Sequence, residues 1–287
     1  MGGMTVIERD FVPIGHYRLP GPGRDGVARR RSEGLARLLH YGDEPVYVHA
    51  RVTGGAVRIR SQGSCPVEAA WGLDRMRFAL ALDHDLRPFH RAFRNDPLIG
   101  PAIRRRPWSR PRRMADPFQA LSWAITEQLI EAERAFEIQR RLVWRYGRHD
   151  AGLDLRDSPS PAAIAARSAP ELEACDLSHG RSLAMIRAAR EVQAGRVDLD
   201  QHEPAWARLR KIREVGSWTL EKLAVHGQGR DDQLPAGDLA YIKLVGRLAR
   251  LGRRATEQEV REFFAPYAPF TALAGLYALI GPGNRSF

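Results

Sequence analysis

The sequence contains little cysteine, and that scarcity excludes several kinds of site. Cys65 and Cys175 are the only two cysteines among 287 residues, and neither belongs to a CxxC motif. Two such separated thiols cannot by themselves ligate a structural zinc ion or a four-cysteine iron–sulfur cluster. The nine histidines form no pair at metal-ligand spacing, and the PCxxC segment of zinc deaminases is absent. We therefore expect free thiols and no catalytic transition metal.

Long apolar runs are also missing. No stretch of about 18 apolar residues occurs, as a membrane-spanning helix would require. The first 20 residues carry Glu8, Asp10 and Pro13, where a signal peptide needs an apolar segment. The sequence therefore predicts a cytoplasmic protein that does not associate with a membrane. Its 44% hydrophobic content suffices for one large or two modest domains.

Lysine is rare although the chain is strongly basic. Of 45 basic residues only Lys211, Lys222 and Lys243 are lysines, and the net charge is +11. Such a charge attracts polyanions, among which nucleic acid is the commonest partner. A GC-rich genome can also enrich arginine by drift, so charge alone does not distinguish DNA from RNA or from no nucleic acid at all.

Strand signals dominate the first 82 residues. Alternating apolar and polar residues in segments 45–53 and 56–60, joined by Gly54-Gly55, predict a β-hairpin. Segments 5–12 and 75–82 are two further strand candidates, and one helix is expected near residues 32–39. We expect residues 1–82 to form a β-rich domain built on a small antiparallel sheet.

Helical periodicity replaces strand alternation after Asp83. Residues 83–287 are predicted to form an all-α domain, which makes the fold class α+β. The segment from Asp116 to Tyr146 is one long helix or two short ones, and an arginine-rich stretch at 104–113 precedes it as a solvated linker or a phosphate contact. Further helices are expected at 161–167, 168–175, 181–194, 257–264 and 270–280.

The most informative segment lies between Leu209 and Leu239. It predicts a helix, a tight turn, a second helix that opens at Ser217, and a Pro-Gly loop that ends in Asp238. The start of a helix exposes N–H groups at its positive end and forms a cradle for phosphate. The carbonyls of the turn point the other way, which makes them a candidate site for Na⁺ or K⁺. No other cofactor is expected. The carbonyls concerned belong to Arg210, Ile212 and Val215.

This segment resembles the helix-hairpin-helix and Gly/Pro-Asp signature of the HhH-GPD DNA glycosylase superfamily, in particular its 3-methyladenine DNA glycosylase II branch. The hairpin lies at about residues 206–226, Gly216 precedes Asp238 by 22 residues, and Leu-Pro-x-x-Asp-Leu reproduces the family's loop. Asp116-Pro117-Phe118 and Gln128-Leu129 resemble the family's upstream helix and wedge loop. The resemblance covers roughly residues 82–280, and the β-rich start matches the extra domain of this branch.

The resemblance implies a monofunctional glycosylase that flips damaged bases, alkylated purines above all, out of double-stranded DNA and excises them by hydrolysis. The resemblance places this reaction in base excision repair, with Asp238 as the catalytic carboxylate. We expect a monomer, the default for a chain that acts on duplex DNA. The alternative for Asp238 alone is an ordinary helix N-cap. Leu129 is either the wedge or a core residue. The implied DNA contacts are Gln128, Leu129, Val215, Gly216, Ser217, Trp218 and Thr219, and the implied base pocket contains Trp218, Lys222, Tyr241 and Phe270.

One position departs from the family's hairpin pattern, and two others bear on substrate and mechanism. Glu214 replaces the hairpin's first glycine, which places a carboxylate beside the phosphate cradle and limits the turn if a positive φ is needed. Lys222 stands where some relatives have an aromatic residue, and its charge would oppose a cationic base. Trp218 stands where bifunctional relatives carry the Schiff-base lysine, which disfavours lyase chemistry.

Three alternative functions stay open. The first is a non-catalytic helix-hairpin-helix protein that binds DNA or senses lesions. The second is a bifunctional glycosylase/lyase that uses Lys222 or Lys243. The third, an RNA-binding or unrelated helical module, rests on charge alone. The sequence does not identify the preferred base.

Overall fold

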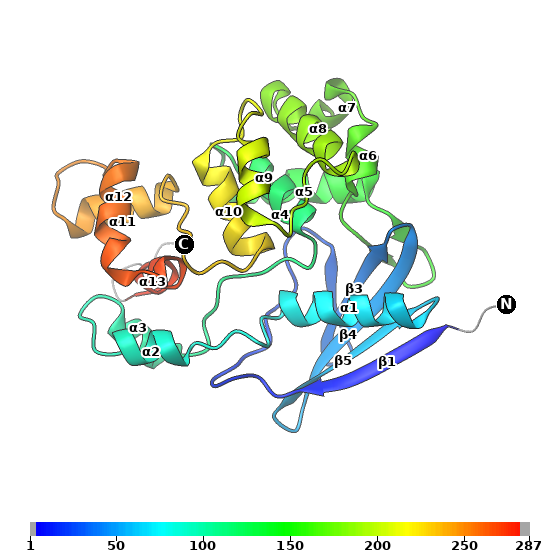
Figure 1. Cartoon of the computed structure of the whole chain (residues 1–287), viewed down its shortest axis with the longest axis horizontal. Helices are drawn as coiled ribbons and strands as arrows, with labels where there is room; N and C mark the ends of the chain where they lie inside the picture. Colours follow the sequence, from blue (N-terminus) through cyan, green and yellow to red (C-terminus); the bar gives the residue numbers. More distant parts are fainter. Residues whose placement is uncertain (1–3, 282–287) are drawn as a thin grey trace.

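The computed structural model describes residues 4–281 and begins with a five-stranded antiparallel sheet (Figure 1). The strands follow the order β1-β5-β4-β3-β2. Gly54 and Gly55 both take a positive φ in the two-residue turn of the β4–β5 hairpin, as that turn requires. The predicted hairpin and the first strand are therefore confirmed. The strand bounds are β1 Thr5–Phe11, β2 Ala28–Arg31, β3 Gly34–Tyr41, β4 Glu44–Thr53 and β5 Ala56–Gly63.

Two predictions within this sheet are wrong. The helix expected near residues 32–39 is strand β3, in which Leu35, Ala36, Leu38 and Leu39 are all buried. A strand with both faces covered lacks alternation, so its pattern resembles that of a buried helix. The strand expected at 75–82 belongs largely to helix α1 (Pro66–Ala79), which lies across the sheet (Figure 1).

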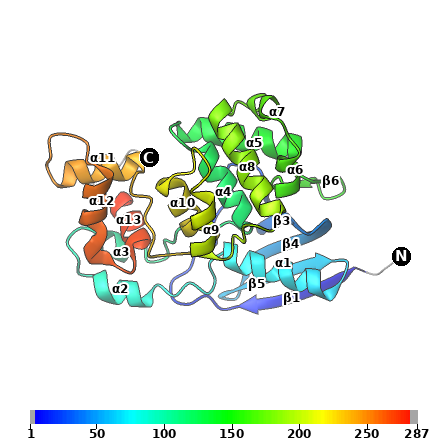
Figure 2. The same cartoon turned by 45° about the horizontal axis from the view of Figure 1, so that its top comes forward.

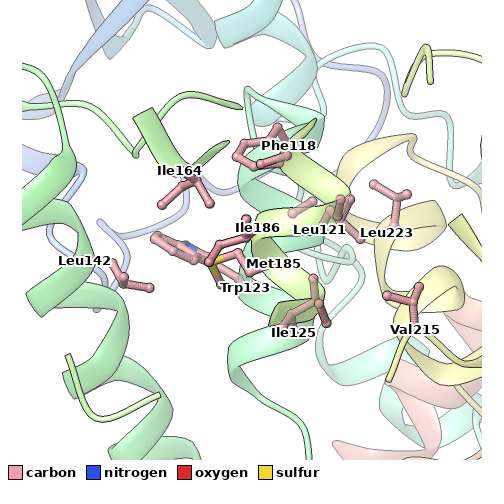
Figure 3. Packing of buried hydrophobic residues seen from close by; sticks show 14 of the residues in the cluster. Phe118, Leu121, Trp123, Ile125, Leu142, Ile164, Met185, Ile186, Val215 and Leu223 are labelled. Carbon is pink, nitrogen blue, oxygen red and sulfur yellow. The ribbon is translucent and has the colours of Figure 1, made fainter. Parts of the chain in front are cut away.

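The first group of helices begins just after the arginine-rich stretch at 104–113. It encloses one hydrophobic core. Trp123 and Phe118 from α4, Met185 from α8 and Leu223 from α10 meet in it (Figure 3). A short ribbon of β6 (His149–Asp150) and β7 (Leu155–Arg156) lies between two of these helices in the sequence. The helices are α4 Pro117–Thr126, α5 Ala132–Tyr146, α6 Pro161–Ala165, α7 Ala169–Glu173, α8 His179–Gln193, α9 His202–Leu209 and α10 Ser217–Gly227.

A second group of helices has a separate core. It combines the two helices that follow α1 in the sequence with the last helices of the described chain, as both views show (Figures 1 and 2). Phe89, Tyr241, Phe264 and Tyr277 are buried within it. The helical part of the chain thus has two separate hydrophobic cores, and a cavity can form where the two groups of helices meet. The members are α2 Arg87–Phe93, α3 Gly100–Arg105, α11 Leu239–Leu248, α12 Glu257–Phe264, the 3₁₀ helix Ala265–Tyr267 and α13 Thr271–Leu279.

A buried polar network joins the sheet to helix α4. Arg37 on β3 donates to Gln119 Oε1 at 2.5 Å, and Gln119 Nε2 donates to Asp25 Oδ2 at 2.9 Å. Trp123 Nε1 donates to the same Asp25 oxygen at 2.8 Å. Buried polar groups need such partners because an unmet hydrogen bond is costly. The network therefore fixes α4, and the loop at its end, relative to the sheet.

The segment from Asp116 to Tyr146 forms two helices. They are separated at residues 127–131, where Leu129 takes a φ of 54°. A residue in this left-handed region cannot continue a right-handed helix. Across residues 4–281, none of the helices is both long and apolar enough to span a bilayer.

Candidate active site

A cavity of about 1150 Å³ lies where the two groups of helices meet. Helix α10 contributes Lys222 and His226, and the start of α11 contributes Asp238 and Tyr241. The arginine-rich stretch from Arg105 to Arg112 forms another part of the wall. One carboxylate, that of Asp238, and several cationic side chains thus converge on a space large enough for a nucleobase and its sugar.

Asp238 is both a helix cap and a cavity residue. The loop Pro235-Ala236-Gly237 turns the chain so that the Asp238 N–H donates to the Pro235 carbonyl at 2.8 Å. Its Oδ1 accepts from Ala240 N at 2.9 Å, and its Oδ2 accepts from Trp218 Nε1 at 3.3 Å. The two alternatives for this residue are therefore compatible, because a carboxylate has acceptor capacity beyond these two bonds.

Trp218 lies in the first turn of α10 and is partly buried. Its indole N–H points at Asp238, and one face of its ring receives the Lys222 ammonium, with Nζ 5.5 Å from the ring centroid. A cation at this distance from a tryptophan face is electrostatically favourable. Trp218 therefore orients the carboxylate and packs against a cation that belongs to the protein.

Lys222 is paired with a residue that the sequence did not single out. Its Nζ lies 2.9 Å from Glu127 Oε2, and the two side chains are 17% and 23% exposed. Burial lowers the pKa of Lys222, but the charge and hydrogen bond of Glu127 outweigh burial and raise the pKa above its usual value. Burial raises the pKa of Glu127, and the charge of Lys222 more than reverses this. Both groups are therefore ionised at neutral pH.

His226 adds no charge to this wall of the cavity. Burial, and then the nearby charge of Lys222, lower the pKa of His226 to about 4. Its Nδ1 lies 2.6 Å from the carbonyl oxygen of Arg112, which a neutral imidazole meets with its N–H. Glu127 and Asp238 are the carboxylates whose charge raises the pKa of Lys222.

The two aromatic pocket candidates lie in different surroundings. Tyr241 lines the cavity, is 8% exposed, and packs edge-on against Phe264. Burial raises the pKa of its hydroxyl, so the group is neutral. Phe270 packs against Phe89 in the second core and does not belong to the cavity wall. Of the four pocket candidates, Lys222 and Tyr241 thus line the cavity with Asp238, Trp218 reaches Asp238 by a hydrogen bond without lining the cavity, and Phe270 does neither.

The hairpin between α9 and α10 keeps the predicted phosphate cradle. Val215 is buried, and its N–H donates to the Ile212 carbonyl at 3.0 Å. Gly216 is the N-cap of α10, and no side chain within residues 4–281 caps this end. The first N–H groups of α10 are consequently available to an anion.

Glu214 holds the conformation that glycine would normally hold. Its φ is 72°, in the left-handed region, and its side chain is exposed. A residue with a Cβ pays roughly 1–2 kcal/mol for this conformation. The glycine expected here by resemblance is therefore replaced at a cost in strain, and a carboxylate stands beside the cradle.

The hairpin and the wedge loop are hydrogen-bonded to each other. Gln128 Nε2 donates to the Glu214 carbonyl at 2.6 Å and to Thr219 Oγ1 at 2.8 Å. Arg181 from α8 donates to the Gln128 carbonyl at 3.2 Å from the other side. The side chains of Gln128 and Thr219 are therefore hydrogen-bonded to other groups of the protein. Ser217 similarly donates its hydroxyl to Glu257 Oε1 at 3.2 Å.

Leu129 projects from this braced loop into solvent. Its relative exposure is 104%, the highest of the large hydrophobic side chains described as exposed. The alternative that Leu129 is a core residue is therefore wrong. A fully exposed leucine on a loop fixed by three hydrogen-bonding neighbours has the geometry of a wedge.

The proposed cation site at the hairpin stays a prediction. Of its three carbonyls, that of Ile212 accepts the Val215 N–H, which leaves it one lone pair for a cation. Among the residues that the structure describes, no three or more histidine, cysteine, aspartate or glutamate side chains form a metal-binding group.

Comparisons with known proteins agree with this geometry. The family described as "HhH-GPD superfamily base excision DNA repair protein" matches residues 122–269, which include the wedge loop, the hairpin and Asp238. The chain is similar to a DNA-3-methyladenine glycosylase of Bacillus subtilis, with 25% identity over 203 residues that cover 68% of this chain and 67% of the relative.

Two solved structures share the fold. A 3-methyladenine DNA glycosylase from Archaeoglobus fulgidus superposes with a TM-score of 0.75 at 21% identity, covering 88% of each chain. An 8-oxoguanine glycosylase/lyase of Clostridium acetobutylicum, in complex with double-stranded DNA, superposes with a TM-score of 0.69 at 14% identity and covers 89% of this chain and 87% of that one. Since the matched family covers more than half of the sequence, the chain belongs to the HhH-GPD superfamily of base excision DNA repair proteins.

Proposed function

We propose that this protein is a monofunctional DNA glycosylase that excises damaged bases, alkylated purines above all, from duplex DNA. The observation that carries the proposal is the Asp238 carboxylate, which faces a cavity next to a helix-hairpin-helix and is oriented by Trp218. The DNA-3-methyladenine glycosylase of Bacillus subtilis supports the alkylated substrate.

Binding begins at the hairpin and the wedge. The open N-terminus of α10 receives a phosphate, and Leu129 enters the duplex where the base leaves. Extruding a base costs a few kcal/mol. Because Gln128 bonds both to the hairpin backbone and to Thr219, the phosphate anchor and the wedge act as one rigid unit. Phosphate contacts carry no sequence information, so we expect binding that is largely independent of sequence.

Asp238 then stabilises the reacting sugar. As the bond between C1′ and the base nitrogen breaks, the electron pair leaves with the base and positive charge develops on the sugar. A carboxylate close to C1′ stabilises this charge and orients or deprotonates the attacking water. The water oxygen bonds to C1′, and the water's proton passes to Asp238 and then to solvent, because a cationic alkylated purine leaves as a neutral base and takes up no proton. The Trp218 N–H keeps one Asp238 oxygen fixed during these steps.

Lyase chemistry lacks a suitable amine in this site. A Schiff base requires an unprotonated lysine. Lys222 is held in its charged form by Glu127, and Lys243 is exposed on the outer side of α11. We therefore propose hydrolysis without strand cleavage.

The test is an assay of duplex DNA treated with a methylating agent, at low salt so that weak binding does not limit turnover. We expect wild-type protein to release free base, strand breaks to arise only after alkali, and borohydride to trap no covalent complex. Strand breaks without alkali together with a trapped complex would establish a lyase instead. DNA binding without any base release would support a non-catalytic protein.

A further inference from the structure

Lys222 forms part of the cavity wall together with Asp238, and its ammonium is paired with Glu127, which does not line the cavity. The pair joins helix α10 to the end of α4, immediately before the wedge loop. Lys222 lines the cavity, and Asp238 is close enough to influence its pKa. A flipped base that reaches Asp238 must therefore come close to the Lys222 ammonium.

The same ammonium covers one face of the Trp218 ring next to the cavity. Positively charged alkylated purines are attracted to the negative face of an aromatic ring. Lys222, which lines the cavity, lies over one face of Trp218, the aromatic residue that is hydrogen-bonded to Asp238. The face is thus satisfied by a cation of the protein, and a second cation there would meet electrostatic repulsion.

We propose that the Lys222–Glu127 pair makes this pocket prefer damaged purines that are neutral and carry a hydrogen-bond acceptor, alkylated ones such as 1,N6-ethenoadenine among them, over alkylated purines with a fixed positive charge, which remain substrates with lower preference. The inference rests on the proposed glycosylase function and names the substrate class of that same site. Lys222 acts as a specificity-determining residue, and Glu127 as the residue that positions it.

The ammonium has donors available for such a base. It carries three N–H groups, and Glu127 accepts from one of them. Neutral purines are poorer leaving groups than cationic ones, because their departure leaves negative charge on the base. A hydrogen bond from Lys222 to a ring nitrogen or exocyclic oxygen stabilises this charge as the C1′–N bond breaks. The proton that the base finally takes up comes from the attacking water.

The rest of the wall favours the same substrates. Arg105, Arg106, Arg110 and Arg112 line the cavity with further positive charge. His226 does not counter this charge, because it is neutral. The negative charge of Glu127 is directed at Lys222 and away from the substrate, which leaves Asp238 as the carboxylate that faces the reacting sugar.

The experiment compares excision from three duplexes of one sequence. They contain hypoxanthine or 1,N6-ethenoadenine, which are neutral, or 7-methylguanine, which is cationic. For each duplex kcat/KM is divided by the rate of spontaneous base loss, so that the lability of the cationic base does not mask the enzyme's preference. The variants are Lys222→Met, the double variant Lys222→Met with Glu127→Gln, and Lys243→Met as a control on an exposed lysine.

We expect wild type to prefer the neutral bases. In the double variant the ratio of normalised kcat/KM values, neutral over cationic base, should fall by at least about tenfold, which corresponds to the loss of one strong hydrogen bond. Lys243→Met should retain the wild-type ratio. The double variant leaves no buried unpaired charge, so it tests the proposal even if Lys222→Met fails to fold. An unchanged ratio in the double variant would overturn the inference and leave the glycosylase function intact. No release of any base by wild type would overturn the proposed function itself.

Discussion

Two helix starts in this protein carry the same aspartate cap but differ in what surrounds it. Asp116 begins α4 and accepts from Phe118 N at 2.9 Å, and Asp238 begins α11 and accepts from Ala240 N at the same distance. Only Asp238 also accepts from an indole N–H and lines the large cavity. The backbone signature is therefore the same, and the surroundings decide which aspartate can act on a substrate.

The electrostatic surroundings differ as well. Burial, and after it the charge of Asp157, raise the pKa of Asp116. The ionised form of Asp116 is thus disfavoured where it stands. Asp238 lies instead near the ammonium of Lys222, which responds to its charge. This comparison leads to five predictions, given from the largest expected effect to the smallest.

The largest expected effect is a difference in the rate of base release between variants of the two helix-capping aspartates, Asp238 and Asp116. Asp238→Asn keeps a capping side chain and removes the charge, so single-turnover base release should fall by about 10³-fold or more. Asp116→Asn makes the same change at the other cap and should alter the rate by less than about twofold. Release is measured by chromatography of free base, and DNA binding by fluorescence anisotropy. Equal losses in both variants would show that Asp238 acts only through the fold.

The hydrogen bond from Trp218 sharpens the comparison. Trp218→Phe keeps an aromatic ring and removes the donor to Asp238, so base release should slow by about tenfold, the value of one hydrogen bond to a charged group. Trp206 on α9 is the matched control, because its buried indole nitrogen contacts no acceptor within residues 4–281. Trp206→Phe should leave the rate unchanged. If both variants slow equally, the Trp218 bond has no special role.

The wedge can be separated from the core by stability. Leu129→Ala should lower kcat/KM by about tenfold and leave the melting temperature unchanged, because its side chain touches solvent. Leu121 is fully buried on the preceding helix, and Leu121→Ala should cost about 2–5 kcal/mol. A large loss of thermal stability in Leu129→Ala, seen by circular dichroism, would contradict the wedge.

Replacing Glu214 in the hairpin should raise both the stability of the protein and its affinity for DNA, whereas the substitutions above lower activity or stability. Glu214→Gly relieves a positive φ, adding about 1 kcal/mol of stability, and removes repulsion of phosphate. DNA affinity at low salt should rise by about threefold. Glu33 has a φ of 58° in the β2–β3 turn, so Glu33→Gly should give the same stability without the gain in affinity. Equal affinity gains would indicate a general effect of charge.

The smallest effect concerns pH. Because the folded pKa of Asp116 is raised, its contribution to stability is fully present below the unfolded value of 3.8 and is lost as pH rises through the raised pKa. Asp116→Asn should therefore flatten the fall in melting temperature over that window. A pH profile of the variant that is parallel to the wild-type profile would show that Asp116 does not titrate there.

Much of this arrangement could be predicted from the sequence because the decisive signals are local. Turn residues and helix caps act over a few positions, so Gly54-Gly55, the hairpin before Ser217 and the cap at Asp238 could be identified directly. The strand predicted at 75–82 was wrong because the short apolar alternation of this segment also fits a helix face. Met76 is buried on that face of α1.

Other features depend on packing that the sequence does not reveal. Glu127 and Lys222 lie far apart in sequence and meet only because α4 packs against α10. No local pattern distinguishes Glu127 from an ordinary surface glutamate. The same holds for Phe270, whose aromatic character suits a pocket and a core equally, and for the second core, which combines helices from both ends of the helical part.

The central claim is that Asp238 stabilises positive charge at C1′, and a binding measurement tests it most directly. Duplexes with an abasic-site analogue whose ring nitrogen is protonated are compared with the neutral tetrahydrofuran analogue, for wild type, Asp238→Asn and Asp116→Asn. We predict that wild type and Asp116→Asn bind the cationic analogue at least about tenfold more tightly, and that Asp238→Asn loses this preference. An undiminished preference in Asp238→Asn would contradict the account.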